Sequence, residues 1–150
     1  METLWQNTTF WSALCGWVLA QLTKMLCFFA VTRRIKPSYL VSTGGMPSAH
    51  SAMATALTTS VGLRYGMGNP LFAVTMAFAI VVMFDAQSVR HAAGIQARII
   101  NQMIDELFKN HRLSEKRLVE LLGHTRLEVF MGLLMGILSA LLVHGLMMPG

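Results

Sequence analysis

The chain has 150 residues, of which 54% are hydrophobic and 13% are charged, whereas a typical soluble domain has about 25% charged residues. Its mean hydropathy is +0.53, and 12 basic against 7 acidic residues give a formal net charge of +5. These values exclude a disordered chain, a small secreted domain held by disulfides and a soluble nucleic-acid-binding protein. They indicate an integral membrane protein with one domain, residues 1–150.

Three segments are long and apolar enough to cross a bilayer, which takes about 20 helical residues. The first is Phe10–Val31, whose one charge, Lys24, lies near its C-terminal end. Tyr65–Phe84 and Val129–Met148 contain no Asp, Glu, Lys or Arg. We therefore predict an all-α bundle built on these three membrane helices.

A fourth helix is expected between the first two spans. Pro37–Leu63 lacks charged residues but is rich in Ser, Thr, Gly and Ala. Its helical part, about Pro47–Leu63, is short and polar for a lipid-facing helix, so neighbouring helices should cover it. Pro47 suits the first helical turn, because its missing N–H costs nothing there. The segment either crosses the membrane or forms a re-entrant hairpin.

The basic residues gather on one side of the predicted spans. Arg33, Arg34 and Lys36 follow the first span, and most of the others lie in Asp85–Arg126. By the positive-inside rule both regions face the cytoplasm, and both termini lie on the opposite side.

The cytoplasmic region between the third and fourth membrane helices has its own helical pattern. Ala86–Phe108 continues the third helix, because its apolar residues keep helical spacing. After an expected turn at residues 110–113, the sequence predicts a short helix, Glu115–Leu122, that stops at Gly123. The sequence Thr125-Arg126-Leu127-Glu128 matches a capping box that opens the last helix.

A Gly-x-x-x-Gly pair, Gly132 and Gly136, lies in the last membrane helix. Such a pair indicates close helix packing. The contact is either within the chain or between two copies, which leaves a homo-oligomer open.

We expect polar residues from the four predicted membrane helices to meet in one layer near the cytoplasmic interface. The two cations Lys24 and Arg90 suit a phosphate group. The glycine-rich run at Gly45 leads into a helix N-terminus, which favours a bound anion. The two histidines, His50 and His124, supply a nucleophile and a general acid. The carboxylate of Glu128, one helical turn after His124, can orient the His124 ring. The six converging residues are Lys24, Ser48, His50, Arg90, His124 and Glu128.

Four further polar residues near this face are candidates for a supporting role, although helix-packing hydrogen bonds explain them equally well: Asp85, Gln87, Asn101 and Asp105. No Cys/His/Asp cluster has metal-ligand spacing, so we predict neither a structural metal nor a cofactor. The carboxylates Asp85, Asp105 and Glu128 leave room for a divalent cation.

Several strings, taken in order, resemble one known family. They are Gly44-Gly45-Met46-Pro47-Ser48-Ala49-His50-Ser51-Ala52, Phe84-Asp85-Ala86-Gln87-Ser88-Val89-Arg90, Ala93-Gly94-Ile95-Gln96-Ala97 and Gly123-His124-Thr125-Arg126-Leu127-Glu128-Val129. Over about Lys24–Gly136 the chain resembles the divergent branch of the type 2 phosphatidic acid phosphatases, which are related to acid phosphatases and vanadium-dependent haloperoxidases. Ala49 and Glu128 depart from the wider family, which has Gly and Asp there.

The resemblance implies a role for each matched residue. Lys24, Ser48 and Arg90 would bind the phosphate, His124 would be the nucleophile and Glu128 would orient it. His50 would protonate the leaving alcohol.

The resemblance also implies a membrane phosphatase that hydrolyses a lipid or isoprenoid phosphate monoester or pyrophosphate through a phosphohistidine. The substrate would be its membrane partner, and no nucleic acid is expected. The alternative is a non-catalytic membrane protein that binds anionic lipid or a partner through its basic face.

Overall fold

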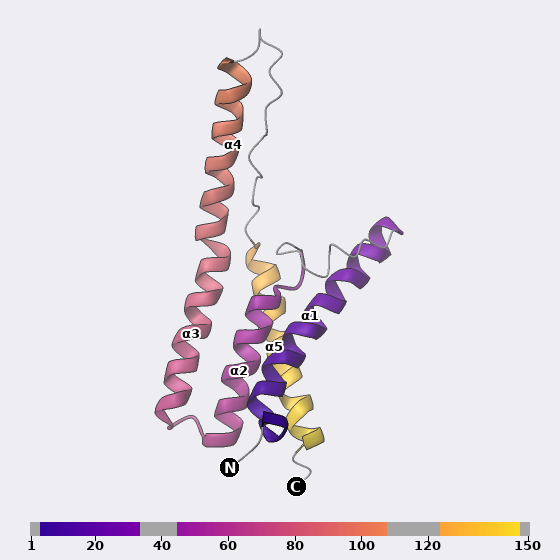
Figure 1. Cartoon of the computed structure of the whole chain (residues 1–150), viewed down its shortest axis with the longest axis vertical. Helices are drawn as coiled ribbons and strands as arrows, with labels where there is room; N and C mark the ends of the chain where they lie inside the picture. The colour runs from indigo at the N-terminus through magenta and orange to yellow at the C-terminus, as the bar shows by residue number, and fades with distance from the viewer. Residues whose placement is uncertain (1–3, 34–44, 108–123, 148–150) are drawn as a thin grey trace.

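The computed structural model describes residues 4–33, 45–107 and 124–147. Four helices pack side by side, and a fifth extends one of them beyond the bundle (Figure 1). In chain order the elements are η1 (Leu4–Gln6), α1 (Thr8–Thr32), α2 (Ala49–Tyr65), α3 (Pro70–Gln87), α4 (Val89–Leu107) and α5 (Arg126–Met147).

Three of these helices are long and apolar enough to cross a membrane: α1, α3 with its extension α4, and α5. The fourth, α2, has 17 residues and packs against α1, α3 and α5. It runs unbroken from one end of the bundle to the other (Figure 1). The structure therefore favours a short, covered, crossing helix over a re-entrant hairpin.

Caps and turn residues place two helix starts later in the chain than expected. Ser48 is the N-cap of α2, so Pro47 precedes the helix instead of lying in its first turn. The third membrane helix starts at Pro70 and not at Tyr65, because Tyr65 ends α2 and Gly66 has a φ of 82°. The Asn69 side chain then caps α3 by accepting from the Leu71 N–H.

The predicted extension of the third helix is confirmed, with one interruption. The helix continues from α3 into α4, and Ser88 lies between the two as a turn. The expected turn at 110–113 and the expected helix Glu115–Leu122 with its stop at Gly123 lie outside the described residues.

Small residues fill the interior, and large apolar side chains cover the outside. Ala20, Ala49 and Ala52 form the fully buried centre, whereas Val81 and Leu138 are each 65% exposed. The exposed apolar side chains are suited to contact with hydrocarbon. The small buried residues let the helices pack closely, which is what holds membrane helices together.

The Gly-x-x-x-Gly pair makes a contact within the chain. A Cβ on Gly132 would lie 2.5 Å from the Ser48 carbonyl oxygen, and one on Gly136 would overlap Thr55 Oγ1 and the Ala52 carbonyl oxygen. Both glycines therefore let α5 approach α2 closely.

The beginning of α1 and the end of α5 lie at the same end of the bundle, and the beginnings of α2 and α5 lie at the other (Figure 1). This arrangement agrees with two termini on one side of the membrane. Which side faces the cytoplasm stays a prediction.

Candidate active site

His124 lies immediately before α5, where the chain enters the bundle. Its backbone N–H donates to the Ala86 carbonyl oxygen at 3.0 Å, which fixes it against the end of α3. Its side chain is only 2% exposed, and its Nδ1 lies 3.0 Å from Oε2 of Glu128. The imidazole is therefore held between two helices and oriented by a carboxylate.

The predicted capping box is confirmed, and it uses the same carboxylate oxygen. Oε2 of Glu128 accepts from the Thr125 N–H at 2.9 Å, while the Glu128 N–H donates to Thr125 Oγ1 at 3.2 Å. Glu128 thus both caps α5 and orients His124. A carboxylate on Nδ1 selects the tautomer with its proton there and leaves a lone pair on Nε2.

His124 Nε2 is buried and has no hydrogen-bond partner in the described part of the chain. Leaving a buried polar atom unpaired costs about 1–3 kcal/mol. A ring nitrogen in this state can attack an electrophile, because no hydrogen bond has to break first.

Ser48 brings the start of α2 to the first turn of α5. Its N–H donates to the Glu128 carbonyl oxygen at 2.9 Å, and its side chain is fully buried. Its Oγ accepts from the Ser51 hydroxyl at 3.0 Å. The buried hydroxyl of Ser48 is thereby held next to the residue that orients His124.

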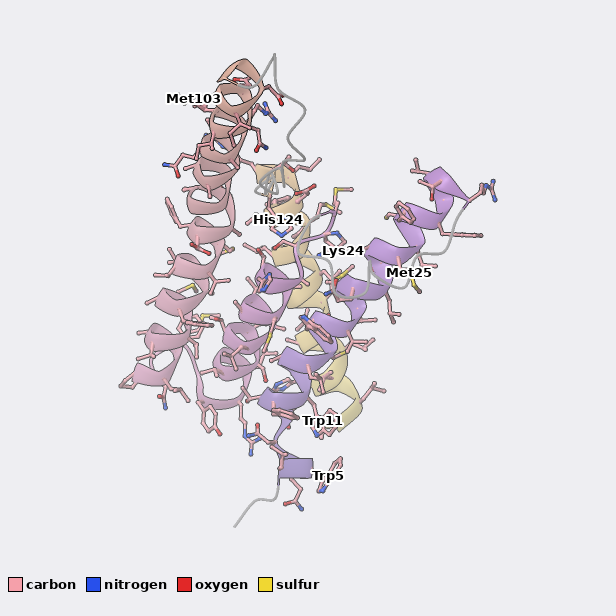
Figure 2. All side chains as sticks on the ribbon, turned by 45° about the horizontal axis from the view of Figure 1, so that its top comes forward. Trp5, Trp11, Lys24, Met25, Met103 and His124 are labelled. Atoms are coloured by element: carbon pink, nitrogen blue, oxygen red, sulfur yellow. The ribbon has the colours of Figure 1, made fainter. Side chains whose placement is uncertain are left out.

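Lys24 reaches this region from α1. It is 3% exposed, and the Glu128 carboxylate acts on it electrostatically. Figure 2 shows Lys24 and His124 at the same end of the bundle. Four of the expected residues, Lys24, Ser48, His124 and Glu128, are thus brought together from three helices.

His50 and Asp85 are exposed and line a separate cavity of about 250 Å³ between α2 and α3. Ala86 lines the same cavity, and its carbonyl oxygen holds the His124 N–H. His50 and His124 therefore flank the same turn of α3.

The remaining expected residues are placed differently. Gly45 is exposed with a φ of 92° just before α2, and Gln87 lines a groove between α3 and α5. Arg90 lies in the first turn of α4, and its side chain is outside the described part.

Asn101 and Asp105 are not brought to His124. They lie 15 and 19 residues beyond Ala86 on a helix that continues away from the bundle (Figure 1). At 1.5 Å per residue this is roughly 22 and 28 Å. Asn101 is buried, whereas Asp105 is exposed.

Gln21 is a residue that the sequence reasoning did not single out. It lies one turn before Lys24 on α1 and is 7% exposed, and its Oε1 has no hydrogen-bond partner in the described ranges. A Gln inside an apolar span is itself the signal that could have identified it.

Comparison with known proteins shows which family the chain belongs to. A profile described as the divergent PAP2 family matches residues 5–139. The chain belongs to the divergent PAP2 family. Within it, this chain is 43% identical over 154 residues to the uncharacterized membrane protein YuiD of Bacillus subtilis (strain 168), covering 95% of this chain and 97% of the relative.

No solved structure matches this divergent PAP2 protein significantly. The match to a membrane protein and the three candidate spans agree in making it an integral membrane protein. Within the described ranges, no three His, Cys, Asp or Glu side chains gather to hold a metal ion.

Proposed function

We propose that this divergent PAP2 protein is a membrane-embedded phosphatase that hydrolyses the phosphate monoester or pyrophosphate of a lipid or isoprenoid. The observation that carries the proposal is the buried imidazole of His124, with Nδ1 on the Glu128 carboxylate and an unpartnered Nε2. Lys24 and Ser48, buried nearby, would bind the phosphoryl oxygens. Arg90, in the first turn of α4, would add a second cation.

The reaction would proceed in two displacements. In the first, the Nε2 lone pair of His124 forms a bond to phosphorus as the phosphorus–oxygen bond to the alcohol breaks, and His50 gives the departing oxygen a proton. In the second, water attacks phosphorus and gives a proton to His50, the nitrogen–phosphorus bond to His124 breaks, and inorganic phosphate leaves. Cations around the phosphoryl group would stabilise both transition states.

The test is phosphate release by the purified protein in detergent. Substrates are phosphatidic acid, phosphatidylglycerol phosphate and polyprenyl phosphates and pyrophosphates, each with and without a chelator. We expect His124→Ala to lower turnover at least about 10³-fold, because no other group supplies the nucleophile. A radiolabelled phosphohistidine should form in the wild type and be absent from His124→Ala.

His50→Ala gives an independent readout of the acid role. Turnover of an alkyl phosphate should fall by about 10²-fold or more, whereas p-nitrophenyl phosphate should be affected little, because its leaving group needs no proton. Membrane insertion and thermal stability of both variants serve as controls. Phosphate-ester binding without any release by the wild type would overturn the proposal and favour a non-catalytic anionic-lipid binder.

A further inference from the structure

A groove between α3 and α5 is not used by the proposed chemistry. Its volume is about 440 Å³, within the roughly 300–1,000 Å³ typical of ligand pockets. Both walls belong to helices apolar enough to cross a membrane. The lining residues are Ile80, Met83, Phe84, Gln87, Arg126, Val129, Phe130 and Leu133.

The polar residues of this groove are confined to one end. Gln87 is the last residue of α3 and Arg126 is the first of α5, so both lie where the helices meet the His124 end of the bundle. From there the apolar lining runs seven residues along each helix, to Ile80 and to Leu133. That is roughly 10 Å into the membrane-spanning part.

The polar end of the groove adjoins the candidate active site along the chain. Arg126 follows His124 by two residues, and Gln87 follows Ala86, whose carbonyl oxygen binds the His124 N–H. A molecule that fills the groove therefore has its polar end beside the backbone segments that hold His124, and its apolar part between α3 and α5.

We propose that this groove binds the hydrocarbon chain of a long-chain lipid phosphate, with Arg126 and Gln87 at the headgroup end. The inference rests on the proposed function and names its substrate class as one with a membrane-embedded chain next to the phosphate. An apolar wall that faces the bilayer selects a hydrocarbon chain, and a guanidinium at the mouth selects an anionic headgroup over a neutral one.

A second cavity at the other end of the bundle provides a contrast. It has a volume of about 310 Å³ and is likewise mostly apolar, but it contains no charged residue among its lining. It includes Gly62, Met67 and Phe72, near the turn from α2 to α3. Hydrocarbon would fit there too, but no side chain marks a headgroup end.

The test compares two neighbouring leucines of α5. Leu133 lines the groove, whereas Leu134 is 39% exposed and does not. For the retention measurement every protein, including the one with the wild-type groove, carries His124→Ala, so that the phosphate ester is not hydrolysed. Full-length Leu133→Trp and Leu134→Trp are reconstituted in phosphatidylcholine vesicles that contain hexadecyl phosphate or hexadecanol. After solubilisation, the bound amphiphile per protein is measured by mass spectrometry.

We expect Leu133→Trp to retain about tenfold less hexadecyl phosphate than the wild type, because the indole fills the space of the chain. Leu134→Trp should retain the wild-type amount. Arg126→Gln should lose the preference for hexadecyl phosphate over hexadecanol. Equal retention by the two tryptophan variants, or no preference for the phosphate in the wild type, would overturn the proposal.

Turnover separates failure of the groove from failure of the chemistry. Leu133→Trp should hydrolyse phenyl phosphate, which has no long chain, at the wild-type rate and hexadecyl phosphate about tenfold more slowly. Equal slowing of both substrates would contradict a chain-binding role. If the wild type hydrolyses neither, the proposed phosphatase is wrong, while the retention measurement still decides what the groove binds.

Discussion

Glu128 performs two tasks with one carboxylate oxygen. Oε2 accepts from the Thr125 N–H and lies 3.0 Å from His124 Nδ1. The sequence predicted each contact separately, since a carboxylate at this spacing fits a capping box and also lies one turn from His124. Only the atomic positions show that the two are made together.

The two tasks can be separated by substitution. Glu128→Gln should preserve the cap, because Gln also serves in a capping box, but it removes the charge that stabilises an imidazolium. We expect turnover to fall by about 10²- to 10⁴-fold with little change in thermal stability. Phosphate release and thermal unfolding in detergent measure the two effects.

Thr125→Ala is the matched control for the cap alone. It should cost about 1 kcal/mol of stability and leave turnover near the wild-type value. Full turnover by Glu128→Gln would contradict an orienting role for the carboxylate.

At the level of helices, the contact between α2 and α5 holds the candidate site together. It depends on the close approach at Gly132 and Gly136, and on Thr55 Oγ1, which donates to the Leu133 carbonyl oxygen at 3.3 Å. At the opposite end, Ser60 Oγ lies 2.8 Å from His144 Nε2 and joins the same two helices. These contacts align Ser48 with Glu128.

Gly136→Ala tests this alignment. The added methyl would overlap Thr55 Oγ1 and the Ala52 carbonyl oxygen, and the backbone atom cannot rotate away. We expect a loss of about 1–3 kcal/mol, read as a lower midpoint of thermal unfolding in detergent.

Gly145→Ala is the comparison within the same helix. No atom lies within 4 Å of an added Cβ there, so this change should be neutral or stabilise by up to about 1 kcal/mol. If Gly136→Ala is as well tolerated as Gly145→Ala, α5 does not depend on a close approach to α2.

For the whole molecule, the helix directions place the beginning of α5 at one end of the bundle, and the beginning of α1 and the end of α5 at the other (Figure 1). His124, two residues before α5, lies at the first of these ends. Basic residues follow the same division. Four arginines of the described residues lie toward the His124 end, at the end of α1, on α4 and at the start of α5: Arg33, Arg90, Arg98 and Arg126. At the other end there is Arg64, in the last turn of α2. The positive-inside rule therefore predicts that the candidate active site faces the cytoplasm.

Cysteine labelling checks this orientation. Cys15 and Cys27, both free thiols, are first replaced by Ala. A membrane-impermeant maleimide should then label Gly68→Cys, in the turn between α2 and α3, in intact cells. It should label Gln96→Cys, on α4, only after the cells are permeabilised. The reverse pattern would show that the site faces outward.

Much of the fold could be predicted because hydrophobicity and helix signals are local. Apolar length identified the membrane helices, and the Thr125–Glu128 spacing identified the start of α5 within the chain. The starts of α2 at Ala49 and of α3 at Pro70 were misplaced by a few residues, because caps and turn glycines compete with the apolar pattern. A polar residue inside an apolar span is a signal of a site residue. This signal identified Lys24, whereas the same signal at Gln21 was overlooked.

The sequence by itself determined that this is an all-α membrane protein and which residue types converge near one interface, because charge is excluded from hydrocarbon and concentrates where helices end. Only the tertiary structure decided which of them meet. Lys24, Ser48, His124 and Glu128 come together from three helices, whereas Asn101 and Asp105 are carried away on α4. The groove beside Arg126 likewise could not be predicted from the sequence, because its walls come from separate helices whose spacing is set by packing.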